Sequence, residues 1–176
     1  MSMADFARTL PDYAKDIRLN IGSLLNEPVL SDQRKYGTLL ACAHATGHRP
    51  LIEAAEAEAA PRLSPEAANA ARAAAAIMAM NNVYYRFTHL ASNEEYRRMP
   101  ARLRMNVIGA PGIDKADFEL FSLAVSAING CGMCIDAHEK VLLGHGVSAE
   151  QIQAAARLAA VVQAAAAVHR SMPVGA

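Results

Sequence analysis

In the stretch Asn129-Gly130-Cys131-Gly132-Met133-Cys134, a turn signal lies directly before a pair of cysteines. Asn-Gly is a strong turn signal, so we expect one helix to end there and another to begin near Cys131. The residues that follow have apolar positions at helical spacing: Ile135, Ala137, Val141, Leu142 and Leu143. The sequence therefore predicts two helices joined by a short turn, with the cysteines at the start of the second.

Cys131, Cys134 and His138 share one face of that second helix, because they follow one another at intervals of three and four residues. Cysteines one helical turn apart have Cα atoms roughly 5–6 Å apart, which a disulfide accepts with little backbone movement. Unpaired amides at a helix N-terminus favour a thiolate at Cys131. His138 lies one turn beyond Cys134 and is a candidate general base for it. The pair predicts redox chemistry, and spacing alone leaves open which thiol is the nucleophile.

The composition of the chain excludes several classes of protein. Its 176 residues fit one domain with a full core, and its three cysteines do not form a secreted disulfide framework. Met1–Arg8 has no apolar signal segment, so we expect a reducing, cytoplasmic setting. The alanine-rich runs 67–80 and 154–168 contain Arg72 and Arg157, so we predict no membrane span. A formal net charge of zero argues against nucleic acid or an anionic membrane as a partner.

Strand signals are scarce, because β-branched and aromatic residues are dispersed while apolar i, i+3, i+4 spacing recurs along the chain. We predict an all-α, single-domain helical bundle over residues 1–176. The predicted helices span 4–14, 17–25, 32–46, 50–60, 65–82, 116–128, 131–144 and 149–169, and 99–112 is predicted to be a connection. Ser64 and Ser148 are predicted N-caps, since an acidic residue follows each in the first turn. The hydrophobic content of 53% also favours homo-oligomerisation.

The two predicted serine caps are 84 residues apart, and similar elements precede each. A helix, a break, a second helix and a capped long helix occur over about 32–90 and again over about 116–170. At the positions of the two cysteines the first copy has Gly47 and Pro50. This pattern predicts a degenerate internal repeat with the CxxC only in the second copy.

Several segments of the chain resemble one protein family. The matching segments are Leu10–Asp16, Gly37–Ala41, Ala79–Arg86, Leu103–Ile108, Pro111–Ile113, Phe118–Leu120 and Ala124–Cys131, with Cys131–Glu139 the most specific. The chain is similar over nearly its whole length to AhpD-type alkylhydroperoxidases, within the carboxymuconolactone decarboxylase superfamily. The resemblance implies an all-helical homotrimer that reduces organic hydroperoxides through its cysteine pair, without a bound metal or haem.

The resemblance also implies a role for each residue of the site. Cys134 would attack the peroxide and become a sulfenic acid, while Cys131 would act as proton donor and then form the disulfide with it. His138 and Glu119 correspond to the histidine and the acid of the family's proton relay. Met133 departs from the pattern, because some relatives have a histidine between the cysteines. A relay step through that histidine is absent from this chain.

The partners of this chemistry are implied by the same resemblance. Electrons would come from a lipoyl group on a dihydrolipoamide acyltransferase, which lipoamide dehydrogenase keeps reduced. They would pass to an alkyl hydroperoxide or to the peroxiredoxin AhpC. Dihydrolipoamide is then a reductant rather than a bound cofactor.

Other interpretations of these residues stay open. The cysteines can be inert core residues, and together with His138 and Glu119 they are a chemically allowed zinc set. The superfamily also includes non-redox lactone decarboxylases, which need no paired thiols. A pure electron-transfer adaptor would serve a peroxiredoxin without meeting peroxide. Cys42 is predicted to be a buried, inert thiol. The remaining histidines share no ligand spacing: His44, His48, His89, His145 and His169.

Overall fold

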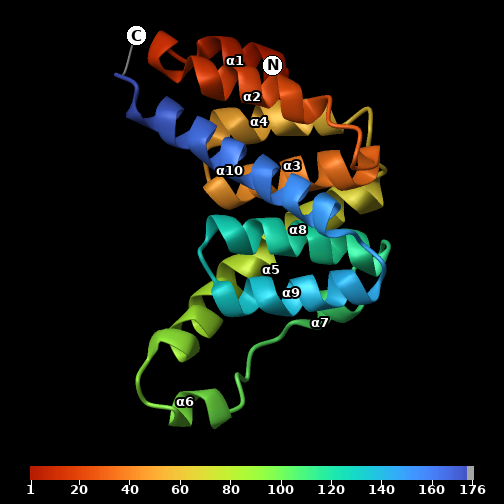
Figure 1. Ribbon diagram of the computed structural model, residues 1–176, viewed down its shortest axis with the longest axis vertical. Helices are drawn as coiled ribbons and strands as arrows, with labels where there is room; N and C mark the ends of the chain where they lie inside the picture. Colours follow the sequence, from red (N-terminus) through yellow and green to blue (C-terminus); the bar gives the residue numbers. More distant parts are fainter. Residues whose placement is uncertain (174–176) are drawn as a thin grey trace.

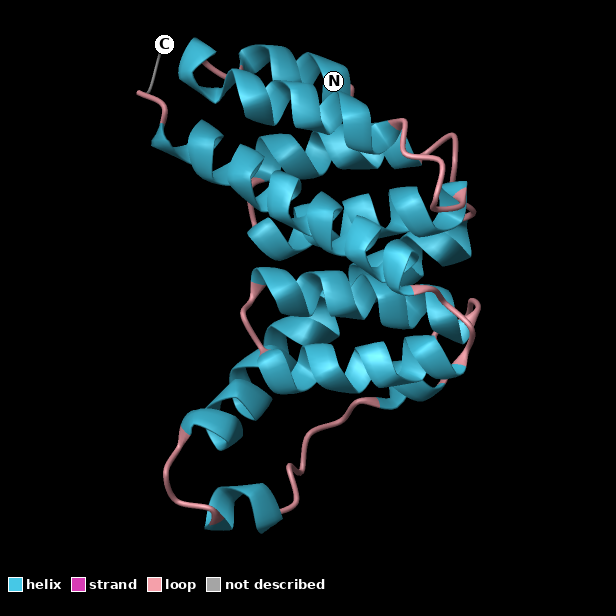
Figure 2. Ribbon diagram, in the orientation of Figure 1, coloured by secondary structure: helices cyan, strands magenta, loops and turns pink. Residues whose placement is uncertain are grey.

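Helices account for all the regular secondary structure of residues 1–173, the part of the chain that this computed structural model describes (Figures 1 and 2). They are α1 (Met3–Thr9), the 3-10 helix η1 (Asp12–Ala14), α2 (Lys15–Leu25), α3 (Asp32–Thr46), α4 (Arg49–Ala59), α5 (Pro65–Leu90), α6 (Glu95–Arg98), α7 (Asn106–Gly109), α8 (Lys115–Ile128), α9 (Gly132–Gly144) and α10 (Ala149–Ser171). The prediction of an all-α fold is confirmed.

Helix α8 lies at the centre of the bundle, where it packs against α3, α5, α9 and α10 (Figure 1). Every residue from Ala116 to Ser126 is buried. The contact between α3 and α8 depends on Gly37, because a Cβ at this position would lie only 2.1–2.8 Å from three ring carbons of Phe121. The absence of a side chain at position 37 therefore lets the phenylalanine ring pack against the backbone of α3.

Helix α10 is long and apolar enough, by length and composition alone, to cross a membrane. In this fold it packs against α3 and α8. Its apolar side chains belong to the protein core, where the buried residues include Leu158, Ala159, Val162, Ala165 and Ala166. Packing inside the bundle therefore accounts for the buried part of this helix, which is 44% of its most apolar window.

Both predicted serine caps are confirmed. Ser64 Oγ accepts a hydrogen bond from the backbone N–H of Ala67 at 3.1 Å, and Ser148 Oγ accepts one from Gln151 at 3.2 Å. The Gln151 side chain in turn accepts from the backbone N–H of Ser148, which completes a capping box. These local interactions explain why the starts of α5 and α10 are readable from sequence.

The prediction of one continuous helix over 4–14 is wrong. The structure divides this segment into α1 and η1, with extended backbone at Leu10. Pro11 is the cause, because proline disfavours helical backbone in the residue before it and has no N–H to donate.

The helix predicted over 65–82 also differs, since α5 continues to Leu90. Asn82 does not end it, because its side chain bonds to Ser126 and Asn129 of the α8 segment rather than to its own backbone. The segment predicted as a connection over 99–112 contains the short helix α7.

The same succession of three helices occurs twice along the chain. Helices α3, α4 and α5 have 15, 11 and 26 residues, and α8, α9 and α10 have 14, 13 and 23. Their origin by duplication stays a prediction. The last residues of the predicted domain, 174–176, lie outside the described part of the chain.

The C-terminal part of α5 extends beyond the bundle and forms, with α6, a projecting arm (Figure 1). Three apolar side chains on this part of α5 face solvent: Val83, Phe87 and Leu90 are 60%, 51% and 73% exposed. Apolar side chains grouped on a projecting element are typical of a surface that contacts another protein chain.

Replacing Gly37 with alanine is expected to lower the free energy of unfolding by about 1–3 kcal/mol, the usual cost of overpacking a core. The added methyl group would overlap the ring of Phe121, which is fully buried. Urea denaturation followed by circular dichroism measures the change.

Gly22→Ala in α2 is the matched control for this prediction. Nothing lies within 4 Å of a Cβ at position 22, so the better helix propensity of alanine should raise stability by up to about 1 kcal/mol. If Gly37→Ala proved as stable as Gly22→Ala, the close packing of α3 on α8 would be contradicted.

Candidate active site

Helices α8 and α9 form a hairpin whose turn carries the cysteine pair. Asn129 is the C-cap of α8, Gly130 has a left-handed conformation with φ 66°, and Cys131 is the N-cap of α9. Glycine adopts this conformation without the strain that a Cβ would cause. The backbone N–H of Cys131 donates to the carbonyl of Ser126 at 3.1 Å, which closes the turn. The predicted break and the predicted helix start beside Cys131 are confirmed.

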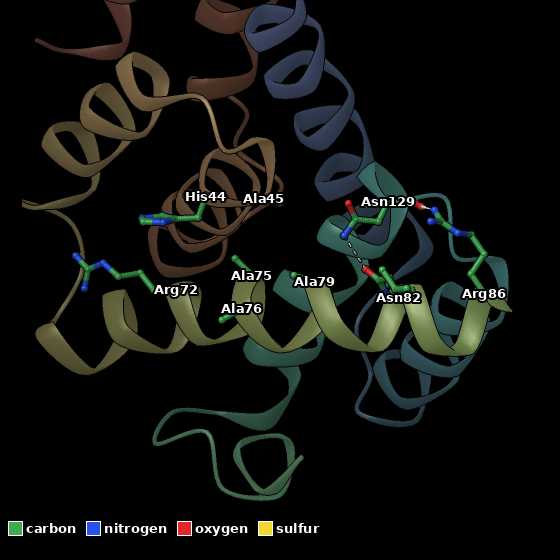
Figure 3. A pocket seen from close by; sticks show the side chains of 10 residues that line it. His44, Ala45, Arg72, Ala75, Ala76, Ala79, Asn82, Arg86 and Asn129 are labelled. Carbon is green, nitrogen blue, oxygen red and sulfur yellow. Dashed lines mark hydrogen bonds between the residues drawn. The ribbon is translucent and has the colours of Figure 1, made fainter. Parts of the chain in front are cut away.

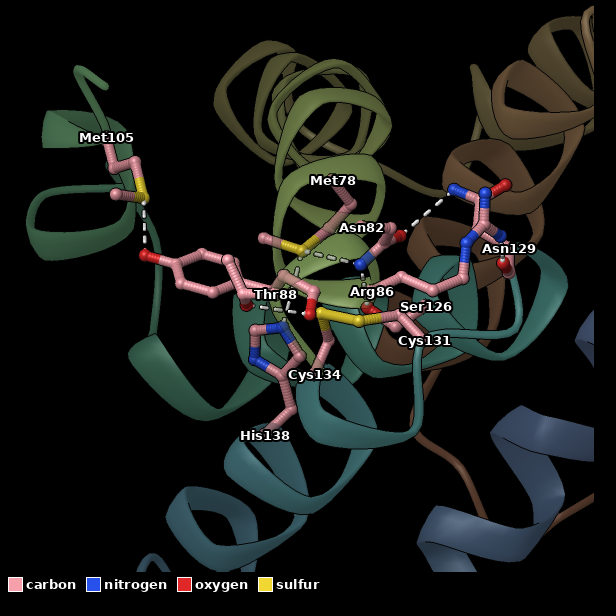
Figure 4. The surroundings of a disulfide bond; sticks show 11 residues. Met78, Asn82, Arg86, Thr88, Met105, Ser126, Asn129, Cys131, Cys134 and His138 are labelled. Atoms are coloured by element: carbon pink, nitrogen blue, oxygen red, sulfur yellow. Dashed lines mark hydrogen bonds between the residues drawn. A yellow bond between two sulfur atoms is a disulfide. The ribbon is translucent and has the colours of Figure 1, made fainter. Parts of the chain in front are cut away.

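Cys131 and Cys134 are joined by a disulfide, with their Cα atoms 5.3 Å apart (Figure 4). This separation lies within the range predicted from their spacing. Cys131 has no exposed surface, whereas Cys134 is 6% exposed and lines a cavity. A molecule that enters the cavity therefore meets Cys134 rather than Cys131.

The cavity beside Cys134 has a volume of about 240 Å³ and is lined by residues of α5, α7, α9 and the loop before α7. Most of its wall is apolar, formed by Met78, Tyr85, Met105, Ile108, Met133 and Ala137. The remaining lining residues are Cys134, His138 and Asn81. An apolar cavity with a few polar groups is the usual form of a binding site for a small organic molecule.

His138 reaches this cavity from α9 and pairs with Glu119 of α8. Its Nδ1 lies 2.6 Å from Oε2 of Glu119, and both residues are buried. The Nζ of Lys115 lies 3.2 Å from the other carboxylate oxygen. Burial raises the pKa of Glu119, but the hydrogen bonds and charges of His138 and Lys115 outweigh it and hold that pKa below its usual range. Glu119 is therefore ionised at neutral pH.

The contact with Glu119 decides which nitrogen of the His138 ring carries a proton. A carboxylate only accepts hydrogen bonds, so Nδ1 is the protonated donor and Nε2 is free to exchange a proton. Nε2 lies 3.3 Å from Sδ of Met78, at the wall of the cavity. The arrangement can move a proton to or from a molecule in the cavity while Glu119 stabilises a positively charged ring. Cys134, His138 and Glu119, predicted as one site, are thus brought together.

The side chains of the buried Asn82 and the half-buried Asn129 hold α5 against the cysteine turn (Figure 4). Asn82 Nδ2 donates to Ser126 Oγ at 2.9 Å, and Asn82 Oδ1 accepts from Asn129 Nδ2 at 3.0 Å. Arg86 donates to the backbone carbonyl of Asn129. These bonds fix the position of the turn relative to the helix that forms the opposite wall of the cavity.

A larger cavity of about 350 Å³ lies along α5, beside the end of α3 and the end of α8 (Figure 3). Its basic side chains have partners within the protein. Arg72 binds Glu56 at 2.6 Å, and His44 binds the same carboxylate at 2.8 Å. No cysteine lines this cavity, so the thiol chemistry belongs to the smaller one.

The cysteine outside the pair, Cys42, is fully buried in α3, as predicted, and burial raises the pKa of its thiol. Two of the remaining histidines, His48 and His169, contact each other at 3.1 Å and connect the start of α4 to α10. Within residues 1–173, no group of three or more His, Cys, Asp or Glu side chains is arranged to hold a metal ion.

Sequence reasoning missed three residues that the structure brings to the site: Met78, Asn81 and Lys115. Met78 and Asn81 are on α5, far from the cysteines in sequence, and no local pattern connects the two segments. Lys115 precedes Glu119 by one helical turn, a spacing that indicates an ion pair once Glu119 is a candidate.

The sequence of this chain is similar to one family model and to several known proteins. The model of the carboxymuconolactone decarboxylase family matches residues 94–175, which include the cysteine pair. The alkyl hydroperoxide reductase AhpD of Rhizorhabdus wittichii is 73% identical over 169 residues, which are 96% of this chain and 98% of that protein. Proteins of the same name from Hyphomonas neptunium and Methylocella silvestris are 67% and 63% identical, over 96% and 94% of this chain and 93% of each relative.

Glu119→Gln is expected to lower the free energy of unfolding by about 1.5–3 kcal/mol at neutral pH, the usual contribution of a hydrogen bond to a charged group. Because folding lowers the pKa of Glu119, its contribution is fully present above the unfolded pKa of about 4.3 and is lost as pH falls through the lower folded value. Urea denaturation of both proteins across this pH range measures the difference. A difference that did not shrink on acidification would contradict the ionised carboxylate.

In the reduced, folded protein, Cys134 is expected to be alkylated well before Cys131 and Cys42, because it alone lines the cavity. Peptide mass spectrometry after timed treatment with iodoacetamide gives the order of labelling. Cys42 should react only after urea unfolds the protein. Initial labelling at Cys131 would show that the accessible thiol had been wrongly identified.

Proposed function

The chain belongs to the AhpD family of alkyl hydroperoxide reductases, and from that premise we propose that it reduces alkyl hydroperoxides through a dithiol–disulfide cycle at Cys131 and Cys134. The overall reaction converts ROOH, two electrons and two protons to ROH and water. The observation that most directly supports it is a disulfide-forming cysteine, Cys134, on the wall of an apolar cavity that also contains His138. The methionine and tyrosine side chains of that wall suit the alkyl part of an organic hydroperoxide.

Cys134 is the nucleophile in this proposal. Its thiolate attacks the outer oxygen of ROOH, the O–O bond breaks, and the sulfur is oxidised to a sulfenic acid while RO⁻ leaves and takes up a proton. The N-cap position of Cys131 favours an anion there, but its side chain is fully buried. Access to the cavity therefore favours Cys134.

Cys131 resolves the sulfenic acid. Its sulfur attacks the sulfur of Cys134, and a disulfide forms. The hydroxyl of the sulfenic acid leaves and combines with one proton to give water. The 5.3 Å separation of the Cα atoms supports a step that needs little movement of the backbone. The disulfide in the structure corresponds to the product of this step.

His138 serves as the base that forms the Cys134 thiolate. In this proposal it also returns the proton to RO⁻, in place of Cys131, the proton donor that the family resemblance implies, because the side chain of Cys131 is fully buried. Glu119 stabilises the charged ring between these steps, which its 2.6 Å contact with Nδ1 supports. Met133 contributes an apolar side chain to the cavity wall where some relatives have a histidine. The proposed relay in this chain therefore uses only His138 and Glu119.

Dihydrolipoamide is the proposed reductant. One of its thiolates attacks the sulfur of Cys134 and releases Cys131, and its second thiol then releases Cys134 and closes the cyclic lipoamide disulfide. A lipoyl group on a dihydrolipoamide acyltransferase, kept reduced by lipoamide dehydrogenase, would supply these electrons. The peroxiredoxin AhpC would be a second acceptor. The position of Cys134 at the cavity supports the first exchange step.

A cytoplasmic homotrimer is the proposed working form. The exposed apolar side chains of the projecting arm, Val83, Phe87 and Leu90, support self-association, because their burial against a second copy is favourable.

Oxidation of NADH, coupled through lipoamide dehydrogenase and lipoamide to tert-butyl hydroperoxide, tests the proposed cycle. Wild-type protein should sustain turnover. Cys134→Ser and Cys131→Ser should each abolish it, because the first lacks the nucleophile and the second cannot form the disulfide. His138→Gln should lower the rate by about 10²-fold or more, chiefly near neutral pH where thiolate formation needs a base. Cys42→Ala, in the core, is the matched control and should retain activity.

Addition of AhpC to the same assay separates this function from its alternatives. Turnover that requires AhpC would identify an electron-transfer adaptor. Full activity in either serine variant would overturn the mechanism. Absence of turnover with and without AhpC would favour a non-redox lactone decarboxylase, whose activity should survive alkylation of the thiols.

A further inference from the structure

Asn81 is a buried polar residue on the cavity wall for which the proposed cycle gives no role. It lies on α5 between Met78 and Tyr85, which line the same cavity. Asn81 is 4% exposed, and its Oδ1 is fully buried without a hydrogen-bond partner among the described residues. An unpaired buried carbonyl is destabilising, and Asn81 lines the same cavity as Cys134, so a molecule bound in that cavity can supply the missing partner.

The next residue in the sequence, Asn82, shows how a structural asparagine is held in the same helix. Its Nδ2 donates to Ser126 and its Oδ1 accepts from Asn129, so both ends of the amide are occupied. Consecutive helical residues point in different directions, so Asn82 contacts the cysteine turn while Asn81 lines the cavity. Because the terminal torsion of asparagine is soft, the Asn81 amide can turn to present either its oxygen or its nitrogen.

We propose that Asn81 is a catalytic residue that binds the hydroperoxide group of the substrate. A carboxamide and a hydroperoxide are complementary, because Oδ1 accepts a hydrogen bond from the outer O–H while Nδ2 donates one to the inner oxygen. This pairing fixes the direction of the O–O bond relative to Cys134. The inference rests on the proposed function and adds to it the group that recognises the peroxide itself.

The contact with Nδ2 becomes stronger as the reaction proceeds. The Cys134 thiolate gives an electron pair to the outer oxygen, which keeps its hydrogen and becomes the hydroxyl of the sulfenic acid. The inner oxygen leaves with the electron pair of the O–O bond as RO⁻ and takes a proton from His138. Nδ2 donates to this developing negative charge in an apolar surrounding, where such a hydrogen bond is stronger than in water.

Asn81→Leu tests the proposal, because leucine removes both hydrogen-bonding groups and keeps the branching and the number of heavy atoms of the side chain. The measured quantity is the rate constant for disulfide formation when the reduced protein is mixed with tert-butyl hydroperoxide in a single turnover. We expect it to fall about 10²-fold, as when one donor to a developing oxyanion is removed. Reduction of the disulfide by dihydrolipoamide involves no O–O bond and should keep its wild-type rate. Asn81→Ala should likewise slow the reaction with the hydroperoxide and leave the reduction of the disulfide at its wild-type rate.

Stability separates a catalytic Asn81 from a structural one. Asn81→Leu should keep or raise the urea midpoint, because it removes an unpaired buried polar group. Asn82→Leu should lower the midpoint, because it leaves Ser126 and Asn129 without their partner. A fall of the Asn81→Leu midpoint as large as that of Asn82→Leu would overturn the catalytic assignment.

The kinetic outcomes distinguish failure of this inference from failure of the proposed function. Wild-type rates with peroxide in both Asn81 variants would overturn the inference and leave the proposed function intact. Equal losses in peroxide reaction and disulfide reduction would also overturn it, since general damage to the cavity would explain them. A wild-type protein that forms no disulfide with the hydroperoxide would overturn the proposed function, and the role of Asn81 with it.

Discussion

Helix α8 is buried along nearly its whole length, so its ionised side chains need partners inside the protein. Asp117 binds Arg34 of α3 at 2.6 Å. Glu119 binds His138 of α9, and Ser126 accepts a hydrogen bond from α5. The contacts of Glu119 and Ser126 thus satisfy polar groups of the central helix and also position the candidate site. A change to this helix therefore affects packing and chemistry together.

The two cysteines on one turn differ mainly in access. The helix N-terminus acts electrostatically at Cys131, the N-cap, but burial closes that residue to any substrate. Cys134, three residues later, lines the cavity and lies on the same helix as His138. A nucleophile must contact the atom it attacks, so geometry outweighs the electrostatic advantage of the N-cap. The adjacent asparagines of α5 also differ in what they contact. Helical periodicity directs the side chain of Asn82 to the cysteine turn and that of Asn81 to the cavity.

Much of the architecture was predictable because it rests on local interactions. The serine caps of α5 and α10, the break at Asn129-Gly130 and the helical spacing of the cysteines are short-range features, and the structure confirms them. The errors have specific causes: Pro11 divides the first helix, and long-range bonds to Asn82 allow α5 to continue. Glu119 was identified only through resemblance to a family, since an acid near the start of a helix carries no local signal for catalysis.

Local sequence was sufficient for the helical class, the cysteine turn and the capacity of two thiols to form a disulfide, because each depends on residues within one or two helical turns. Tertiary packing decided which thiol reaches the cavity, which nitrogen of His138 is protonated, and which asparagine of α5 is left unpaired. These properties depend on contacts between helices that are distant in sequence. Burial and hydrogen-bond partners are set only when those helices come together, so the spacing of residues along one helix does not contain them.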